Sequence, residues 1–472
     1  MNRIILFLTF VGVCTTVLGS EKQSSRPNIL FIMADDLGIK DLGCYGSDYY
    51  RTPNLDKLAE QGMRFTHAYA GCHVCSPTRA SILSGQFPHR VQITDALPWD
   101  RLYENPKMVP PDHLKELPSN LPTFAKALRL AGYKTALFGK WHLGNEYQFF
   151  TEGKHKAYGF DEAFPSTGAE RKRDKSVDDL TERTLEFLES NSEWPFMLCL
   201  MHHTPHVPLA CLPEDEAIYD DVPKGQFQKN QKYAGMVSHL DQSIQTILDK
   251  LDELGLAENT VVLFTSDNGG LKEVTSNEPY RGAKGNLYEG GIRVPLIVRW
   301  PKHINTGLVC NAAVHSADYF PTFLELAGLD PMPEAHKDGI SMLPIWKGDM
   351  PEKRTFYWHF PHRQNPASAV IQEGWKLVHQ IVSNRYELFD LKTDPWEQNN
   401  LTIEHPEKFE DLKSLLENHL KNSGAQRMQT NPEWDSTRTQ GKIRNYGTYY
   451  PAEGGKIQQI KEPYPSWFKG KY

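Results

Sequence analysis

The chain has 472 residues, of which 39% are hydrophobic and 24% charged, and its formal net charge is −7 with a pI near 6.2. This length exceeds that of a usual single core, so we expect two domains, or one large domain with an appendage. The acidic balance argues against nucleic acid as a bulk partner. It does not exclude an anionic substrate, because a local pocket can be positive on an acidic protein.

Residues 1–20 contain one basic residue, a short apolar run and small residues near their end. This pattern predicts a secretory signal peptide, and therefore a secreted or periplasmic protein, or a lysosomal or extracellular one in a eukaryote. A lipoprotein signal at Cys14 is an alternative, although Val13 stands where such signals usually carry a small residue. No later stretch reaches the apolar length that predicts a membrane span.

Apolar strands alternate with amphipathic helices through the first three-quarters of the chain. We predict strands over 28–33, 64–69, 135–138, 196–201 and 261–265, and helices over 54–61, 121–131, 177–189 and 232–254. This alternation predicts an α/β fold, with a large, mixed, mostly parallel sheet between helices on both faces.

The pattern changes after about residue 343. Short strands are predicted over 354–360, 368–371, 376–380 and 386–390, followed by a helix over 406–421. They predict a small antiparallel sheet with one helix packed on it. We therefore divide the chain into the signal peptide 1–20, a main domain 26–345 and a C-terminal subdomain 346–472. The tail from residue 423 is rich in aromatic residues without periodicity, and we expect it to pack across the main domain.

Four polar clusters each follow a predicted strand: Asp35 and Asp36; Lys140 and His142; His202, His203 and His206; and Asp267 and Asn268. In open α/β sheets the ligand site lies beyond the carboxyl ends of the strands, so we expect these clusters to converge on one crevice. Their carboxylate and amide oxygens suit calcium, with magnesium as the alternative, and do not suit zinc. Taken singly, each Asp is more often a turn or cap residue.

The run from Cys75 to Gly85, CSPTRASILSG, predicts a short helix. Ser76 is expected as its N-cap, Pro77 as its first residue and Gly85 as its stop. Cys75 would then lie just outside the helix N-terminus, where free N–H groups favour an anion. An ordinary buried cysteine is the plain alternative.

The cysteines make a poor disulfide framework. Without Cys14 and Cys75, five of the seven cysteines remain, an odd number for so long a chain. One or two bridges could form, and we expect a fold that does not depend on them.

Cys75, Pro77 and Arg79 resemble the Cys-x-Pro-x-Arg signature of the type I sulfatases, members of the alkaline phosphatase superfamily. The stretches 139–144, GKWHLG, and 281–295 resemble two further motifs of that family, and the resemblance covers roughly residues 27–348. It implies an arylsulfatase-like sulfuric ester hydrolase, with a catalytic domain over 26–345. It also implies a maturation partner, the formylglycine-generating enzyme, which oxidises the cysteine to formylglycine.

The resemblance further implies a metal site and a mechanism. One calcium ion would be held by Asp35, Asp36, modified Cys75, Asp267 and Asn268. Hydrated formylglycine would attack sulfur with one hydroxyl and release sulfate as the other re-forms the aldehyde. Arg79 and Lys140 would hold this nucleophile, and His142 would accept or relay its proton. Lys284 and His206 would bind sulfate and stabilise or protonate the leaving oxygen, and sequence does not decide which of the two donates that proton.

A secreted chain with many aromatic residues suits a carbohydrate sulfate, because aromatic rings stack on sugars. We expect a sulfated polysaccharide or its oligosaccharides, including algal galactans and glycosaminoglycans. Two loops are predicted to select the sugar: 90–107, with Arg101, and 169–175, with Arg171. A solvated charged face is the alternative for the second loop.

Two other functions compete with this interpretation. One is a formylglycine-dependent phosphonate or phosphate monoester hydrolase of the same superfamily. The other is a non-catalytic binder of sulfated glycans, which the completeness of the expected site disfavours.

Overall fold

The computed structural model describes residues 26–98, 100–166, 173–363 and 365–438, and the backbone of short strands at 443–446, 448–449 and 458–459. For residues 100–103 it describes the backbone alone. The predicted signal peptide 1–20 lies outside the described residues. So do the tail aromatics Tyr450, Tyr464, Trp467, Phe468 and Tyr472.

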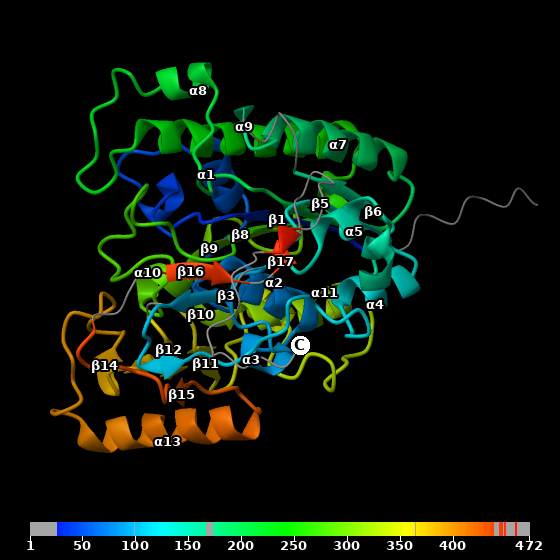
Figure 1. Ribbon diagram of the computed structural model, residues 1–472. Helices are drawn as coiled ribbons and strands as arrows, with labels where there is room; N and C mark the ends of the chain where they lie inside the picture. Colours follow the sequence, from blue (N-terminus) through cyan, green and yellow to red (C-terminus); the bar gives the residue numbers. More distant parts are fainter. Residues whose placement is uncertain are drawn as a thin grey trace, which may run out of the picture.

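One eight-stranded sheet forms the centre of the molecule (Figure 1), with the strand order β10-β2-β9-β8-β1-β7-β5-β6. Its strands are β1 (Asn28–Ala34), β2 (Met63–Tyr69), β5 (Lys134–Gly139), β6 (Glu162–Pro165), β7 (Phe196–Met201), β8 (Thr260–Ser266), β9 (Arg293–Arg299) and β10 (Leu308–His315). All neighbouring pairs are parallel except those of β9, which runs antiparallel to β2 and β8. The predicted mixed, mostly parallel sheet is confirmed.

Helices cover both faces of this sheet, because alternate residues of its buried strands face opposite ways. Ile29, Phe31 and Met33 belong to one apolar core, and Leu30 and Ile32 belong to the other. The first core includes residues of α2 (Cys75–Ser84), α4 (Phe124–Leu130) and α11 (Tyr319–Leu326). The second includes residues of α1 (Pro53–Glu60), α7 (Val177–Ser190) and α9 (Gln231–Glu253). Figure 1 shows these two helical layers above and below the sheet.

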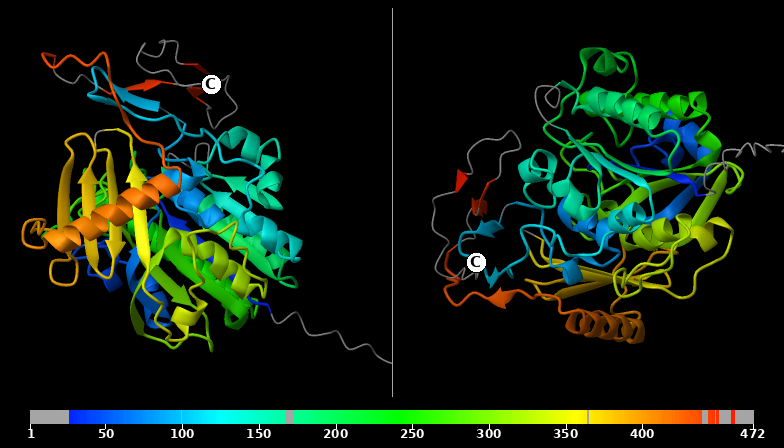
Figure 2. Two further views of the ribbon diagram at one scale, coloured as in Figure 1. Left: turned by 90° about the horizontal axis from the view of Figure 1, so that it is seen from below. Right: turned by 90° about the vertical axis from the view of Figure 1, so that its right-hand side faces the viewer.

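A second, antiparallel sheet follows the first in the chain. It contains β11 (Thr355–Phe360), β12 (Ala367–Gln372), β13 (Trp375–Gln380) and β14 (Arg385–Asp390) in that order. The helix α13 (Pro406–Asn422) lies across one face of it (Figure 2), where Leu412, Leu416 and Leu420 pack on the strands. The other face packs on residues of the main domain, among them Tyr288 and Ile292. The predicted small antiparallel sheet with one packed helix is also confirmed.

The tail pairs with a distant part of the chain. The strand β3 (Asp100–Tyr103) pairs with β16 (Ile443–Tyr446), and β4 (Met108–Val109) pairs with β15 (Gln429–Thr430). The expectation of a loop throughout 90–107 was therefore wrong for 100–103, because a partner strand from the tail supplies its hydrogen bonds. The expectation that the tail packs back onto the main domain agrees with this pairing.

Two local expectations also differ from the structure. The helix α2 begins at Cys75, with Val74 rather than Ser76 as its N-cap. Ser76 is the second residue of the helix, and its hydroxyl accepts a hydrogen bond from the Leu97 N–H at 3.0 Å. Three strands of the large sheet were not predicted: β6 and β10 are its two edge strands, and β9 lies between β2 and β8.

The remaining elements are short. They are α3 (Pro88–Val91), α5 (Glu146–Phe150), α8 (Pro213–Ala217), α10 (Glu289–Ile292), α12 (Leu343–Trp346), the 3-10 turns η1 (Gly43–Tyr45), η2 (Lys154–Tyr158), η3 (Ala257–Asn259) and η4 (Ser316–Asp318), and the strands β17 (Thr448–Tyr449) and β18 (Gln458–Gln459). The six cysteines within the described residues are all free thiols. None of the helices described in the structure has the length and apolar character needed to cross a membrane.

Candidate active site

Four adjacent parallel strands, β8, β1, β7 and β5, end at the same edge of the large sheet. The four polar clusters follow these strands directly, so the sheet brings them together at one point, as the positional argument predicted. Gly139, the last residue of β5, has φ 102°, and a Cβ there would collide with the Met201 carbonyl. Glycine is therefore required where β5 and β7 end side by side, and the Lys140 N–H then donates to the Met201 carbonyl at 2.8 Å.

Three buried carboxylates form the centre of the site. Asp35, Asp36 and Asp267 are at most 1% exposed. The backbone N–H of Asp36 donates to Asp267 Oδ1 at 3.2 Å, and Asn268 Nδ2 donates to Asp36 Oδ1 at 2.8 Å. Asp36 has φ 63°, in the left-handed region that Asp tolerates better than most residues. This turn directs two consecutive carboxylates into the same space.

Each carboxylate has a cationic partner. Lys140 Nζ lies 2.6 Å from Asp35 Oδ2, Lys284 Nζ lies 2.7 Å from Asp36 Oδ2, and Arg79 Nη2 lies 2.8 Å from Asp267 Oδ2. Arg79 also donates from Nη1 to the Lys140 carbonyl at 2.9 Å. Arg79 lies on α2, Lys140 follows β5 and Lys284 lies in the loop before α10. These ion pairs therefore hold three separate segments together.

These contacts separate the pKa values of the carboxylates. Burial alone would raise the pKa of Asp35, but attraction to Lys140 and His206 outweighs it and holds the pKa well below its usual range. Burial and the nearby Asp35 raise the pKa of Asp267 to about 6, despite Arg79. Asp35 is therefore ionised at neutral pH, whereas Asp267 holds its proton more tightly than an ordinary aspartate.

Cys75 lies inside this ring of charges, at the first residue of α2. Its Sγ is 3.5 Å from Asp35 Oδ1, 3.9 Å from Asp36 Oδ1 and 3.7 Å from Lys284 Nζ. The side chain is 2% exposed, and burial raises its pKa to about 12 even though Lys140 and Lys284 oppose the shift. The encoded thiol is thus protonated at neutral pH and would be a poor nucleophile.

Two histidines, His206 and His203, lie beside these carboxylates. His206 Nε2 lies 3.4 Å from Asp36 Oδ2, while its Nδ1 lies 2.5 Å from the Val207 carbonyl, which requires a proton on Nδ1. Burial lowers the pKa of His206, although Asp35 and Asp36 act in the opposite direction. His203 Nε2, 3.9 Å from Asp35 Oδ2, is a close neighbour that the sequence indicated without a role.

His142 itself has a positive φ, 55°. Its Nε2 lies 2.6 Å from the Leu97 carbonyl, and its buried Nδ1 has no hydrogen-bond partner among the described residues. Burial and the positive charges of Lys140 and Arg79 hold the pKa of His142 well below its usual range. A neutral imidazole whose Nδ1 is unoccupied can accept a proton.

The residues present fit a divalent cation. Ligand atoms of Asp35, Asp36, Cys75 and His206 all lie within 4.8 Å of one another. Asn268 Oδ1 is buried and has no hydrogen-bond partner within the described part of the chain. A buried orphan oxygen beside three carboxylates is what a calcium or magnesium ion would satisfy. His206 was not among the predicted ligands and joins the cluster because the turn after β7 folds back toward β1.

A network of hydrogen bonds that supports the turn at Asp36 was not predicted from the sequence. Tyr233 in the first turn of α9 donates to Asp41 Oδ2 at 2.7 Å and to the Asp36 carbonyl at 3.2 Å. The Thr275 hydroxyl and Gln228 Nε2 donate to Asp41 Oδ1 at 2.7 and 2.9 Å. These contacts fix the turn that presents Asp36. Nothing in the local sequence pattern around Tyr233 or Thr275 indicates this role.

The two predicted specificity residues stay predictions. Arg101 lies on β3, where its backbone pairs with Asn445, and its side chain is outside the described part. Arg171 lies outside the described residues altogether. Its neighbour Arg173 pairs with Asp178 at 2.8 Å and turns toward α7.

Comparison with known proteins identifies the family of the chain. The family described as Sulfatase matches residues 27–329, and the one described as N-sulphoglucosamine sulphohydrolase, C-terminal, matches residues 283–426. The chain belongs to the sulfatase family. The predicted recognition as a type I sulfatase of the alkaline phosphatase superfamily is confirmed, and with it the assignment as a hydrolase of sulfate esters.

Individual sulfatases resemble the whole chain. A sulfatase of Formosa agariphila is 29% identical, over 89% of this chain and 93% of its own. The N-acetylgalactosamine-6-sulfatase of Sus scrofa is 32% identical, over 82% of this chain and 77% of its own. The crystal structure of Ps i-CgsB in complex with k-i-k-neocarrahexaose has a TM-score of 0.74 and 27% identity, and covers 87% of this chain and 96% of its own.

Proposed function

We propose that this sulfatase removes sulfate from a sulfated carbohydrate, with formylglycine at position 75 as its nucleophile and one calcium ion as its cofactor. The observation that carries the proposal is the position of Cys75 Sγ, within 4 Å of Asp35, Asp36 and Lys284. Burial keeps its thiol protonated and therefore a poor nucleophile, which supports a chemical modification of this side chain.

Two groups bring chemistry that the encoded side chains lack. Hydrated formylglycine supplies one hydroxyl for attack on sulfur and a second whose deprotonation releases sulfate. Calcium supplies positive charge beside the transferring group, and Asp35, Asp36, Asp267 and Asn268 would hold it. Magnesium is the alternative if water completes its coordination.

The chain's own residues then have distinct tasks. Lys140 and Arg79 fix the orientation of Asp35 and Asp267, and so the position of residue 75 between them. His142 Nδ1 is our choice for the acceptor of the attacking hydroxyl's proton, because it is buried and unoccupied.

Lys284 and His206 divide the work at the sulfate. Burial opposes the charge of Lys284, but Asp36 and the other acidic groups raise its pKa, so it keeps its proton and suits the binding of an anion. His206 Nδ1 is held by the Val207 carbonyl, so Nε2 faces the site, and the protonated imidazole would be a stronger acid than Lys284 because burial lowers the pKa of His206. We therefore assign His206 to the leaving oxygen and Lys284 to the sulfate.

The carbohydrate assignment rests on the relatives and on composition. The Sus scrofa relative is an N-acetylgalactosamine-6-sulfatase, and the similar crystal structure holds a neocarrahexaose. With 52 aromatic residues, 11% of the chain, this sulfatase has rings available for sugar stacking. We propose a polysaccharide or oligosaccharide substrate, and Arg101 and Arg171 as contacts to it.

Several further assignments belong to the same proposal. The catalytic domain spans 26–345 and the C-terminal subdomain 346–472. The signal peptide 1–20 directs the protein out of the cytoplasm, and a formylglycine-generating enzyme acts during its maturation.

The test compares turnover of a sulfate ester and a phosphate ester of the same phenol by the wild type and by Cys75→Ala. We expect sulfate release by the wild type, at least 1000-fold faster than by the variant, with an unchanged circular dichroism spectrum. Peptide mass spectrometry of the active enzyme should show formylglycine at position 75. An active preparation carrying only the thiol would refute the mechanism, and preferred phosphate turnover would favour the phosphohydrolase.

A further inference from the structure

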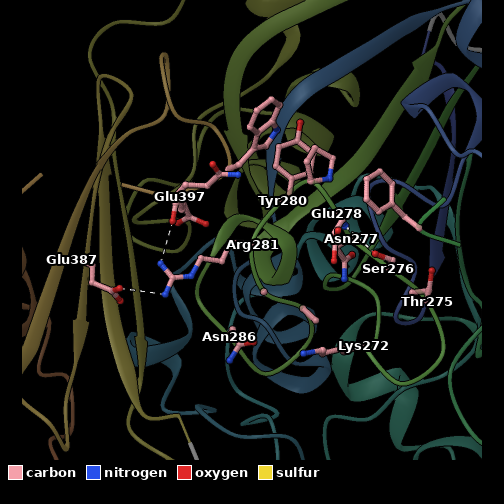
Figure 3. Close-up of a pocket in the computed structure, with 16 residues that line it drawn as sticks. Lys272, Thr275, Ser276, Asn277, Glu278, Tyr280, Arg281, Asn286, Glu387 and Glu397 are labelled. Carbon is pink, nitrogen blue, oxygen red and sulfur yellow. Dashed lines mark hydrogen bonds and ion pairs between the residues drawn. The ribbon is translucent and has the colours of Figure 1, made fainter. Parts of the chain in front are cut away.

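A cleft of about 910 Å³ lies between the loop that carries Lys284 and the C-terminal sheet (Figure 3). Residues 275–283 and Asn286 line one side, and Glu387 and residues 396–398 line the other. Ala283 lines the cleft and is followed by Lys284 of the catalytic site, so the same loop contributes to both. No residue of the proposed mechanism lines this cleft.

The cleft exposes aromatic rings. Trp396 is 43% exposed and Phe227 is 38% exposed, and both line it together with Tyr280. Large aromatic side chains usually bury most of their surface, so two exposed rings in one concave site point to a ligand with apolar faces. The C–H face of a pyranose ring is such a surface.

The cleft also offers polar groups without partners. The side-chain amides of Asn286 and Gln398 make no hydrogen bond to any described residue. An amide presents both a donor and an acceptor, which matches the paired hydroxyls of a sugar. Stacking rings beside free amides are the combination that a carbohydrate subsite requires.

The frame of the cleft is rigid. Arg281 donates from Nη1 to the Glu397 carbonyl at 3.1 Å and from Nη2 to Glu387 Oε1 at 3.2 Å, and Figure 3 shows it bridging the gap. Its guanidinium also lies over the Tyr288 ring, 3.9 Å from the centroid. The loop and the sheet are therefore held at a fixed separation before any ligand arrives.

The charges of the cleft select a neutral ligand. Its lining holds the carboxylates of Glu278, Glu387 and Glu397 and the cations Lys272 and Arg281. Arg281 is already bonded to Glu387, so Lys272 is the one lining cation with no partner among the described residues, and Glu278 offsets it. A sulfate group would gain little attraction here, in contrast to the catalytic site.

We propose that this cleft is a subsite for an uncharged pyranose ring of the substrate chain, adjacent to the sulfated ring bound at Lys284. The inference rests on the proposed function, because it assumes a carbohydrate substrate. It goes further in predicting that the enzyme recognises an unsulfated ring next to the one from which it removes sulfate.

The test measures binding of neutral hexasaccharides from chemically desulfated carrageenan, desulfated fucan, galactan and mannan by isothermal titration calorimetry. We expect at least one to bind the wild type and Trp396→Ala to weaken that binding about tenfold or more. Trp194→Ala, which removes a 54% exposed ring outside the cleft, is the matched control and should bind as the wild type does. Phe227→Ala serves as a second variant should Trp396→Ala fail to fold.

Turnover of a small aryl sulfate separates the two proposals. It should be unchanged in Trp396→Ala, whereas the KM for a sulfated hexasaccharide should rise with little change in kcat. Failure of every neutral hexasaccharide to bind, or equal binding by wild type and Trp396→Ala, would overturn the subsite while aryl sulfate turnover still supports the sulfatase. An inactive wild type would instead count against the proposed function.

Discussion

At the scale of single residues, the carboxylates that surround Cys75 are the least stable part of the site without a cation. Burial and the nearby charge of Asp35 raise the pKa of Asp267 to about 6. A divalent ion would lower that pKa by direct attraction. On our proposal, the three aspartates therefore serve mainly to bind the ion.

Asp267→Asn should abolish ion retention and lower activity at least 100-fold, because it removes a charged oxygen ligand and the partner of Arg79. Elemental analysis should give about one calcium per wild-type chain and none per variant chain. Asp178→Asn, in the separate cluster with Asp174 and His239, is the control and should retain the ion. Zinc as the retained metal would contradict the ligand assignment.

The division of work between Lys284 and His206 is testable with leaving groups. Since His206 is assigned to the leaving oxygen, His206→Ala should lose about 100-fold in kcat on a sugar sulfate but much less on nitrophenyl sulfate, whose phenolate needs no proton. Lys284→Ala should lose activity on both, because each substrate presents the same sulfate. A leaving-group dependence for Lys284→Ala alone would reverse the two roles.

At the scale of elements, buried histidines join α3, β11 and α13. His89 Nε2 lies 2.9 Å from His419 Nε2, and the His419 ring stacks on Tyr357 at 3.7 Å. Burial lowers the pKa of His359 and of His419 to about 4, and holds that of His89 well below its usual range. These rings are therefore neutral in the folded protein at pH 7.

This interface should weaken in acid. The unfolded chain binds protons at His359 and His419 near pH 6.5 and the folded chain only near pH 4, so their contribution to stability is lost as the pH falls between those values. His419→Gln should flatten the dependence of the melting temperature on pH over this range. His405→Gln, on an exposed residue of the same subdomain, is the control and should keep the wild-type slope.

The pH dependence of His419→Gln must be compared with that of the wild type, because other groups change the stability in the opposite direction as the pH falls. Burial raises the pKa of Asp41 and of Asp241 to about 6, so these carboxyls favour the folded state as the pH falls. An equal slope for His419→Gln and wild type would mean that this histidine is not neutral in the folded protein.

Helices and strands with a strong hydrophobic pattern were predicted well. Strands that depend on pairing with a distant segment of the chain were predicted poorly. The strand β7 was predicted at its observed bounds, because its six residues are continuously apolar and lie between helices. The strand β10 was missed since its exposed Leu308 and Val309 and its central Asn311 break any pattern. The pairing of β3 with β16 joins segments more than 300 residues apart, and four residues carry no local signal of such a partner.

The site residues could be predicted because they follow strands that lie side by side. The contacts that hold these residues in place could not be predicted. Asp35, Lys140, His206 and Asp267 come together because their strands are adjacent and parallel, which alternation in the sequence implies. The Leu97 carbonyl that holds His142 and the Tyr233 hydroxyl that holds Asp36 lie on segments whose approach depends on the whole fold. Supporting contacts of this kind have no motif.

At the scale of the whole molecule, a buried ionic triad joins the two sheets. Lys376 on β13 lies 2.9 Å from Glu289 Oε1 on α10 and 2.8 Å from Glu397 Oε1, and all three side chains are fully buried. Burial would raise the pKa of Glu289, but Lys376 and Arg293 lower it. The C-terminal sheet therefore supplies a charge that the main domain requires.

Lys376→Met should lower the free energy of unfolding by about 3–5 kcal/mol, because it leaves buried carboxylates without their cation. Denaturant unfolding followed by both tryptophan fluorescence and circular dichroism should give one transition at a lower midpoint. Lys392→Met, on an exposed lysine shortly after the same sheet, should change the midpoint little. Separate transitions for the two sheets would show that they fold independently.

The burial of position 75 sets the timing of biogenesis. Cys75 is 2% exposed and Arg79 is 4% exposed, and Arg79 is engaged with Asp267. A converting enzyme cannot reach either side chain in the folded protein, so on our proposal it must act while the polypeptide is still being synthesised or exported. A host without that enzyme would accumulate a folded but inactive protein, and later incubation with the enzyme would not restore activity. Recombinant production therefore calls for co-expression of both genes in one cell.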